Sequence, residues 1–361
     1  MTIHAPHSPI APTRALRYLS DMRHLPVLSR ALAFGVWLLA APVFAASLED
    51  TYATWETLRS PDTAAVRFEH GYQFLQKNPA WSEEKIIRLR TEAAAMYERP
   101  AHDVMAKFCS DYPPISGRGM IACVVAKVGD AATQAQLVRT AWIQGDFNED
   151  EESRILKSYS ETITYAEHRA RMDRLLYEGK LKHAKRMLTR VSVAERNLFS
   201  LRLALLANEK NAPRLVNTLT ASQQRDAGIL FERLRWRTRK GDDDLFSLLD
   251  AAPKTVPYPE LWWPMRASVA RDAIGKGNYK QALAVIAPHG ELSGETLADA
   301  LWLKGWLLLQ HHDNAGDAYK AFFALYTSVT TPVSKARAAY WAARAAEKNG
   351  NPDIANEWLE K

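Results

Sequence analysis

Residues 262–286 most constrain what this chain can fold into, because they describe two helices joined by a tight turn. One helical pattern runs to Ile274, and Gly277 and Asn278 then supply residues that tolerate a left-handed backbone. A second helical pattern begins at Tyr279, and Ala282 is small enough for two antiparallel helices to approach closely. The stretch is typical of a tetratricopeptide-like helical hairpin.

Turns of the same kind recur along the chain, beginning at Gly145, Gly179, Gly241, Gly277 and Gly350. The first two lie 34 residues apart, the next pair 36, and the last pair 73, which is two units. Those are helix-pair repeat lengths, and no stretch alternates with period two for long. We therefore predict an all-α fold: an α-superhelix or solenoid of stacked antiparallel helix pairs, curved into a horseshoe or partial ring.

Composition excludes several classes of protein. The 361 residues are 47% hydrophobic and 24% charged, so the chain can bury a sizeable core. Its net charge of +6 falls to about +3 once 1–45, with four arginines and one aspartate, are left out. That charge is too mild to indicate nucleic acid binding, and the histidines lack the spacing of a metal site. We expect no metal and no cofactor.

The N-terminus predicts export. An apolar run at 31–44 follows a basic segment, and slender residues precede a cut between Ala45 and Ala46. This layout is typical of a secretory signal peptide, and the run is too short for a comfortable membrane span. We expect a signal peptide at 1–45, a superhelical domain at 46–361, and no transmembrane segment after cleavage. The alternative is an uncleaved N-terminal anchor.

Export permits disulfides, and the chain has two cysteines, Cys109 and Cys123. A segment rich in Pro and Gly, 111–119, lies between them and is expected to be a loop. Helices on either side could bring the sulfurs together, closing a loop of about 15 residues worth about 3 kcal/mol. Two separately buried free thiols are the alternative.

Large aromatic residues predict where the core is densest. The helical pattern at 297–309 has almost no polar side, which is typical of a helix buried on most of its faces. We expect the helices that hold Trp302, Trp306, Tyr340 and Trp341 to be the best buried. The change Trp306→Ala is then expected to cost about 3–5 kcal/mol as a core truncation.

Several stretches resemble one family. They are 159–188, 262–271, 299–306 and 336–345, and the most specific is the Ala-Arg-Ala-Ala-Tyr-Trp-Ala-Ala-Arg helix at 336–344. In this order they resemble the N-terminal superhelical domain of the soluble lytic murein transglycosylases of Gram-negative bacteria. The resemblance covers about residue 47 to the end. It implies a periplasmic protein of peptidoglycan turnover whose superhelix is followed by a lysozyme-like domain.

The family's chemistry is implied by the same resemblance. A glutamate in a Glu-Ser pair, with Gly-Leu-Met-Gln downstream, protonates the glycosidic oxygen between N-acetylmuramic acid and N-acetylglucosamine. The muramic 6-hydroxyl then attacks, so the enzyme is a carbon–oxygen lyase that leaves a 1,6-anhydro product. The implied partners are peptidoglycan glycan strands, held weakly by the superhelix, and the catalytic domain.

This sequence departs from that pattern. Its one Glu-Ser-Arg is at Glu152, inside an acidic helix start, and no Gly-Leu-Met-Gln follows. We expect Glu152 to be a solvated first-turn carboxylate rather than a catalytic acid. The chain stops within a helical pattern at 358–361, so the catalytic domain is expected to be missing. We therefore predict no catalytic residue and no activity for this chain alone.

Two questions stay open at this stage. Trp262, Trp263, Arg266 and Arg271 either hold helices together or meet sugar rings and peptide carboxylates. The protein itself is either the superhelical part of a lytic transglycosylase or a stand-alone periplasmic adaptor that binds a peptide or protein. A weaker third hypothesis is an enzyme that uses the acids at 242–244. Those acids are expected at a turn.

Overall fold

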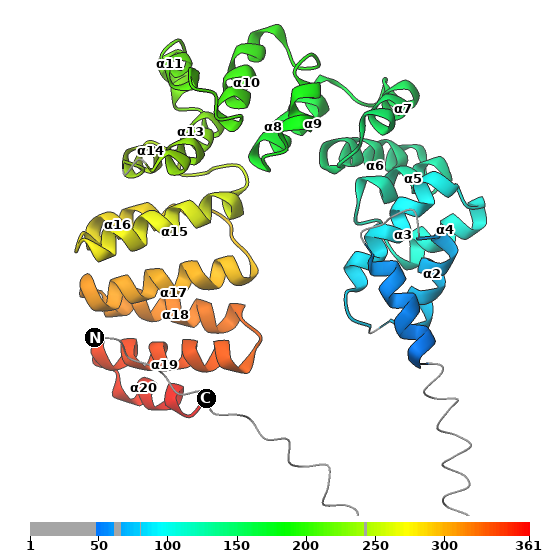
Figure 1. Cartoon of the computed structure of the whole chain (residues 1–361). Coiled ribbons are helices and arrows are strands. Elements are labelled where there is room, and N and C mark those ends of the chain that lie inside the picture. Colours follow the sequence, from blue (N-terminus) through cyan, green and yellow to red (C-terminus); the bar gives the residue numbers. More distant parts are fainter. Residues whose placement is uncertain (1–47, 61–65, 80, 242–243) are drawn as a thin grey trace, which may run out of the picture. The chain divides into compact units, whose positions relative to one another are not determined.

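The computed structural model describes residues 48–60, 66–79, 81–241 and 244–361 (Figure 1). Within these ranges the chain is all α-helical and has no β-strand, as predicted. The expected signal peptide and the cut between Ala45 and Ala46 lie outside the described residues. The chain divides into two compact units, one ending at Ile115 and the other beginning at Ser116.

The first unit is a small helical cluster. Its helices are 48–59, α2 (Phe68–Lys77), α3 (Glu84–Glu98) and α4 (His102–Asp111). Helix α2 packs on α3 at Gly71, where a Cβ atom would lie 2.0 Å from the Thr91 hydroxyl. Phe68 and Tyr72 of α2 both meet Phe108 of α4 edge-on, with ring centroids 5.2 Å apart. The close approach of α2 and α3 at Gly71 and the aromatic contacts with Phe108 together stabilise this unit.

The second unit is a long series of helices. They are α5 (Gly117–Val125), α6 (Ala131–Gln144), α7 (Glu149–Tyr159), α8 (Tyr165–Tyr177), α9 (Leu181–Met187), α10 (Val193–Leu206), α11 (Ala212–Val216), α12 (Ala221–Gln224), α13 (Ala227–Lys240), α14 (Phe246–Asp250), α15 (Pro259–Gly275), α16 (Tyr279–Ile286), α17 (Gly294–His311), α18 (Ala315–Ser328), α19 (Pro332–Lys348) and α20 (Pro352–Leu359). Most of these helices pack on a neighbour in the sequence, while α6 also packs on α8 and α10 on α13.

The hairpin prediction is confirmed in the C-terminal part of this unit. Helices α15 and α16, α17 and α18, and α19 and α20 form successive layers (Figure 1). Ala282 of α16 is fully buried against α15, as its small size requires. Gly179, Gly241, Gly277 and Gly350 all have φ between 70° and 78°, which favours glycine. The fold is therefore solenoid-like, while the expected horseshoe stays a prediction.

Other glycines allow close packing. Gly145 lies between α6 and α7, as predicted, but its φ of −76° is not left-handed, unlike that of the other turn glycines. A Cβ atom at Gly145 would lie 2.3 Å from the Phe147 ring. Gly117, expected in a loop, is instead the first residue of α5, and its Cβ would lie 2.6 Å from the Gly145 backbone. In α17, Gly305 lets the Phe322 ring approach, since a Cβ there would be 2.7 Å away.

Candidate functional site

The glutamate that the family motif singles out, Glu152, lies in a buried ionic network. It accepts hydrogen bonds from Arg171 Nη2 at 2.8 Å and from Arg186 Nε at 2.8 Å. Arg171 is also fully buried, and its Nη1 donates to the backbone oxygens of Trp142 and Gly145. Arg171 thus satisfies carbonyls at the end of α6 while it neutralises the first turn of α7. The prediction that this carboxylate is solvated is wrong, because α8 covers it.

This environment is the opposite of what a general acid needs. Burial by itself raises the pKa of Glu152, but hydrogen bonds from Arg186 and Arg171 outweigh burial and place the pKa below its ordinary value. A carboxyl that protonates a leaving group works best with a pKa raised toward the working pH. Glu152 is therefore a structural carboxylate that joins α7 to α8 and α9.

Most of the residues considered for sugar contact are buried. Trp262, Trp263 and Arg266 are at most 4% exposed, so no glycan reaches them without unfolding of α15. Arg266 Nη1 donates to Val285 O at 2.7 Å, and burial lowers the pKa of Arg266 to about 10. Arg271 is exposed and forms an ion pair with Asp299 at 2.8 Å. The helix-packing interpretation holds for Trp262, Trp263 and Arg266, while the question stays open for Arg271.

A row of aromatic rings instead crosses α16, α17 and α19. We call it the aromatic row, and its members in spatial order are Tyr279, His311, Trp306, Trp302, Trp341 and Tyr340. Consecutive ring centroids lie 3.5, 4.9, 6.3, 6.2 and 5.6 Å apart. Six rings in unbroken contact therefore span three helices of the solenoid.

The aromatic row borders the core, because Tyr279, Trp302, Trp306 and Trp341 pack against the core from one side and are only partly buried. Tyr340 is 51% exposed, while Trp302, Trp306 and Trp341 are half-buried. The helices that hold these rings were expected to be the best buried, and α17 and α19 do both pack on α18, but the buried face of α19 consists of alanines, among them Ala339 and Ala342. Small alanines let α18 and α20 approach α19 closely, while Tyr340 lies on its exposed side.

One cation belongs to this surface. The exposed Arg337 holds its guanidinium carbon 4.9 Å from the centroid of the Trp302 ring. Such contacts orient a guanidinium while they leave its donors available to a ligand. The sequence held a signal for this surface in the i, i+4 spacing of Trp302 and Trp306. The same spacing is equally typical of a buried helix face, so the sequence alone did not predict this surface.

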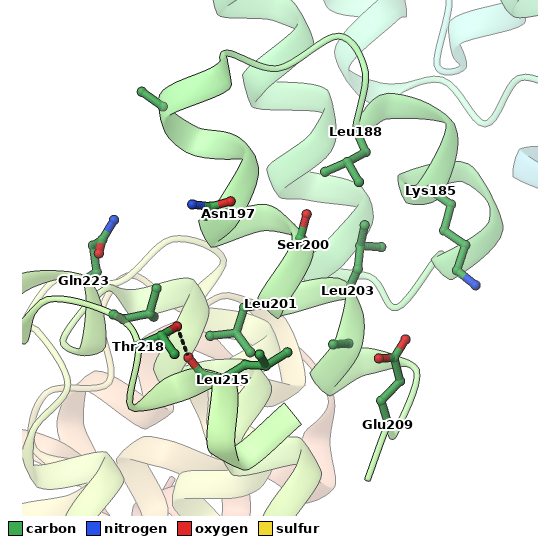
Figure 2. A pocket seen from close by; sticks show the side chains of 13 residues that line it. Lys185, Leu188, Asn197, Ser200, Leu201, Leu203, Glu209, Leu215, Thr218 and Gln223 are labelled. Atoms are coloured by element: carbon green, nitrogen blue, oxygen red, sulfur yellow. Dashed lines mark hydrogen bonds between the residues drawn. The ribbon is translucent and has the colours of Figure 1, made fainter. Parts of the chain in front are cut away.

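A second candidate is a pocket of about 640 Å³ beside α10 (Figure 2). Asn197 and Ser200 of α10, Thr218 and Gln223 line it with hydroxyl and amide groups, and Leu201 adds an apolar wall. The pocket exists because α11 and α12, which follow α10, are only 5 and 4 residues long. They leave part of α10 uncovered, and the groups there suit amide and hydroxyl ligands.

The two cysteines lie in different helices. Cys109 is in α4 and Cys123 is in α5, both are buried, and neither is a free thiol. The pairing of Cys109 with Cys123 stays a prediction, which mass spectrometry of the non-reduced protein would test.

Two comparisons with known proteins found no match. No family model matches the chain, and no curated protein matches it at a significant level. Across the described ranges, no cluster of three or more His, Cys, Asp or Glu side chains could hold a metal ion. None of the described helices is long and apolar enough to cross a membrane.

Proposed function

We propose that this chain is the superhelical part of an exported, periplasmic lytic transglycosylase and that its aromatic row binds peptidoglycan glycan strands. The observation that supports the proposal is the row itself, with ring contacts running unbroken across three helices. Sugar rings have C–H faces that pack against aromatic faces, and their hydroxyls can bond to the polar tips of Tyr and Trp.

The cation beside the row suits the same polymer. Muramyl residues carry peptides with free carboxylates, and Arg337 is exposed beside Trp302. Guanidinium groups bind carboxylates in a forked geometry. In this proposal the superhelix holds the strand, and a separate catalytic domain of the parent enzyme cleaves the bond between N-acetylmuramic acid and N-acetylglucosamine.

Sedimentation with purified murein sacculi tests the binding step. Tyr340→Ala removes the most exposed ring of the row and should raise the Kd by about two- to tenfold, equivalent to about 0.5–1.5 kcal/mol. Tyr97→Ala is a matched control, since Tyr97 is 53% exposed and lies in α3, far from the row in sequence. Equal binding by the wild type and Tyr340→Ala would contradict the proposal.

The catalytic step has its own test. The purified chain incubated with sacculi should release no anhydromuropeptides above the buffer control, as judged by mass spectrometry of the soluble products. Proton transfer by a positioned acid contributes about 10²–10⁴-fold, and Glu152 cannot supply it while its pKa is depressed. Release that disappears in Glu152→Gln would show that this glutamate is catalytic after all.

The adaptor hypothesis has one observation in its favour, the pocket beside α10 (Figure 2). Its amide and hydroxyl groups could bind the backbone of an extended peptide, as solenoid surfaces often do. Asn197→Ala should then weaken peptide binding, while Tyr340→Ala should leave sacculus binding unchanged. The opposite pair of results favours the glycan-binding proposal.

A further inference from the structure

A separate cavity of about 250 Å³ lies between α11 and α13. One part of its wall is apolar and comes from Leu205, Pro213 and Val216. Helix α11 stands between this cavity and the pocket of Figure 2, because Val216 lines the first whereas Leu215 lines the second. A ligand of this cavity would therefore be small and would need some hydrocarbon surface.

The opposite wall of the cavity is cationic. It is formed by Arg233, Trp236 and Arg237 of α13, and Asn217 adds a carboxamide. Arg237 already has an acidic partner, since its Nη1 lies 3.5 Å from Asp244 Oδ2 and donates to Asp244 O at 2.6 Å. The charge of this residue is thus partly neutralised by the chain itself.

Arg233 differs from Arg237 in this respect. Its side chain is half-buried, yet no hydrogen bond or ion pair joins it to another residue in the part of the chain that the structure describes. Burial lowers the pKa of Arg233, and the neighbouring charge of Arg237 lowers it further. A half-buried cation is costly unless an anion pairs with it. Arg171 and Arg174 of the same unit both have such partners.

We propose that this cavity binds a small carboxylic acid with a short apolar body, whose carboxylate pairs with Arg233. The forked donors of a guanidinium match a carboxylate, and Asn217 can donate a further hydrogen bond. The apolar body lies against Val216, Leu205 and the Trp236 ring. A carboxylic acid fits better than inorganic phosphate because half of the wall has no polar group to offer. This site does not depend on the proposed glycan binding, which involves other helices.

N-acetylalanine is a suitable probe, with its neutral methylamide and inorganic phosphate as comparisons. Isothermal titration calorimetry on the full chain should detect the acid, while the methylamide should not bind. The indole N–H resonance of Trp236, assigned by its loss in Trp236→Phe, should shift with the acid. Binding of the methylamide equal to that of the acid, or binding of phosphate alone, would overturn the proposal.

Two variants separate binding from folding. Arg233→Gln should lower the affinity for N-acetylalanine at least tenfold and should leave the melting temperature without ligand unchanged or higher, because it removes an unpaired charge. Arg225→Gln, a change at an exposed arginine, should alter neither quantity. Unchanged affinity in Arg233→Gln contradicts the proposal.

An acid of the chain itself is the rival occupant. Asp242 and Asp243 lie outside the described residues but close to Asp244 in sequence. If N-acetylalanine binds the Asp242→Asn, Asp243→Asn double variant and does not bind the wild type, the chain's own carboxylates fill the site and the proposal fails.

Discussion

Two buried glutamates of the second unit, Glu152 and Glu232, have opposite surroundings. Glu152 accepts hydrogen bonds from Arg171 and Arg186, which hold its pKa below the ordinary value although burial alone would raise it. Glu232 of α13 is fully buried, and no hydrogen bond to its carboxylate oxygens is found among the described residues. Its nearest cation, Arg235, is 3.6 Å away, which makes a loose ion pair.

The difference follows from where each arginine directs its donors. Arg235 donates to the backbone oxygens of Leu176 and Tyr177 at 3.1 and 2.6 Å, so it has little left for Glu232. Burial therefore dominates and raises the pKa of Glu232 to about 7. The comparison teaches that burial alone does not set the charge of an acid; the hydrogen bonds that reach it do.

Removing Arg171, which bonds directly to Glu152, should have the largest effect on stability. Arg171→Met leaves Glu152 with one arginine, removes the Arg171 donor from Trp142 O, and leaves Gly145 O with Arg174 Nη2 alone, at 3.2 Å. Breaking a buried ion pair from one side costs about 3–5 kcal/mol. Urea unfolding should show this loss. A loss below about 1 kcal/mol would mean that Arg186 and solvent replace Arg171.

Neutralising the first glutamate should cost less and should depend on pH. Glu152→Gln keeps an acceptor but removes the negative charge that pairs with Arg171 and Arg186, at a cost of about 2–3 kcal/mol at pH 7. Because the folded pKa is depressed, the wild-type advantage is present above the unfolded value of 4.5 and is lost as the pH falls through the folded pKa. Thermal unfolding at pH 7 and pH 3 measures it. An equal difference in stability between the wild type and Glu152→Gln at both pH values would contradict the prediction.

Neutralising the second glutamate should stabilise the protein. The folded pKa of Glu232 is raised, so the folded state binds more protons than the unfolded state between pH 4.5 and about 7, and stability falls as the pH rises through that window. Glu232→Gln removes this fall and should add about 1–3 kcal/mol at pH 8, with little change at pH 4. Destabilisation at pH 8 would show that Glu232 is paired and charged in solution.

An exposed ion pair should show the smallest effect. Arg271 and Asp299 lie 2.8 Å apart, with side chains 54% and 37% exposed. Arg271→Gln should cost less than about 1 kcal/mol, and less still in high salt, because water and ions screen the pair. Thermal unfolding of the wild type and the variant in 0.05 and in 0.5 M NaCl measures the cost of the change at each salt concentration. A cost near that of Arg171→Met would remove the distinction between buried and exposed pairs.

Much of the helical framework could be predicted from the sequence. Asp130 caps α6 and Ser192 caps α10, each accepting a hydrogen bond from the backbone N–H of the third helical residue, and Asp and Ser are among the residues that favour this position. Gly179 and Gly277 turn between helices with positive φ, also as predicted. These features depend on residues only a few positions apart, so local chemistry decides them.

The candidate sites could not be predicted in the same way, because burial and pairing depend on helices far apart in the sequence. The close contact of Gly145 with the Phe147 ring was not predicted, and Tyr340 is half exposed on a helix that was expected to be among the best buried. Glu152 is buried only because α8 delivers Arg171 to it across the fold. Most helix caps and turns were thus determined by the sequence alone, whereas tertiary packing decided which faces are buried and which charges are paired.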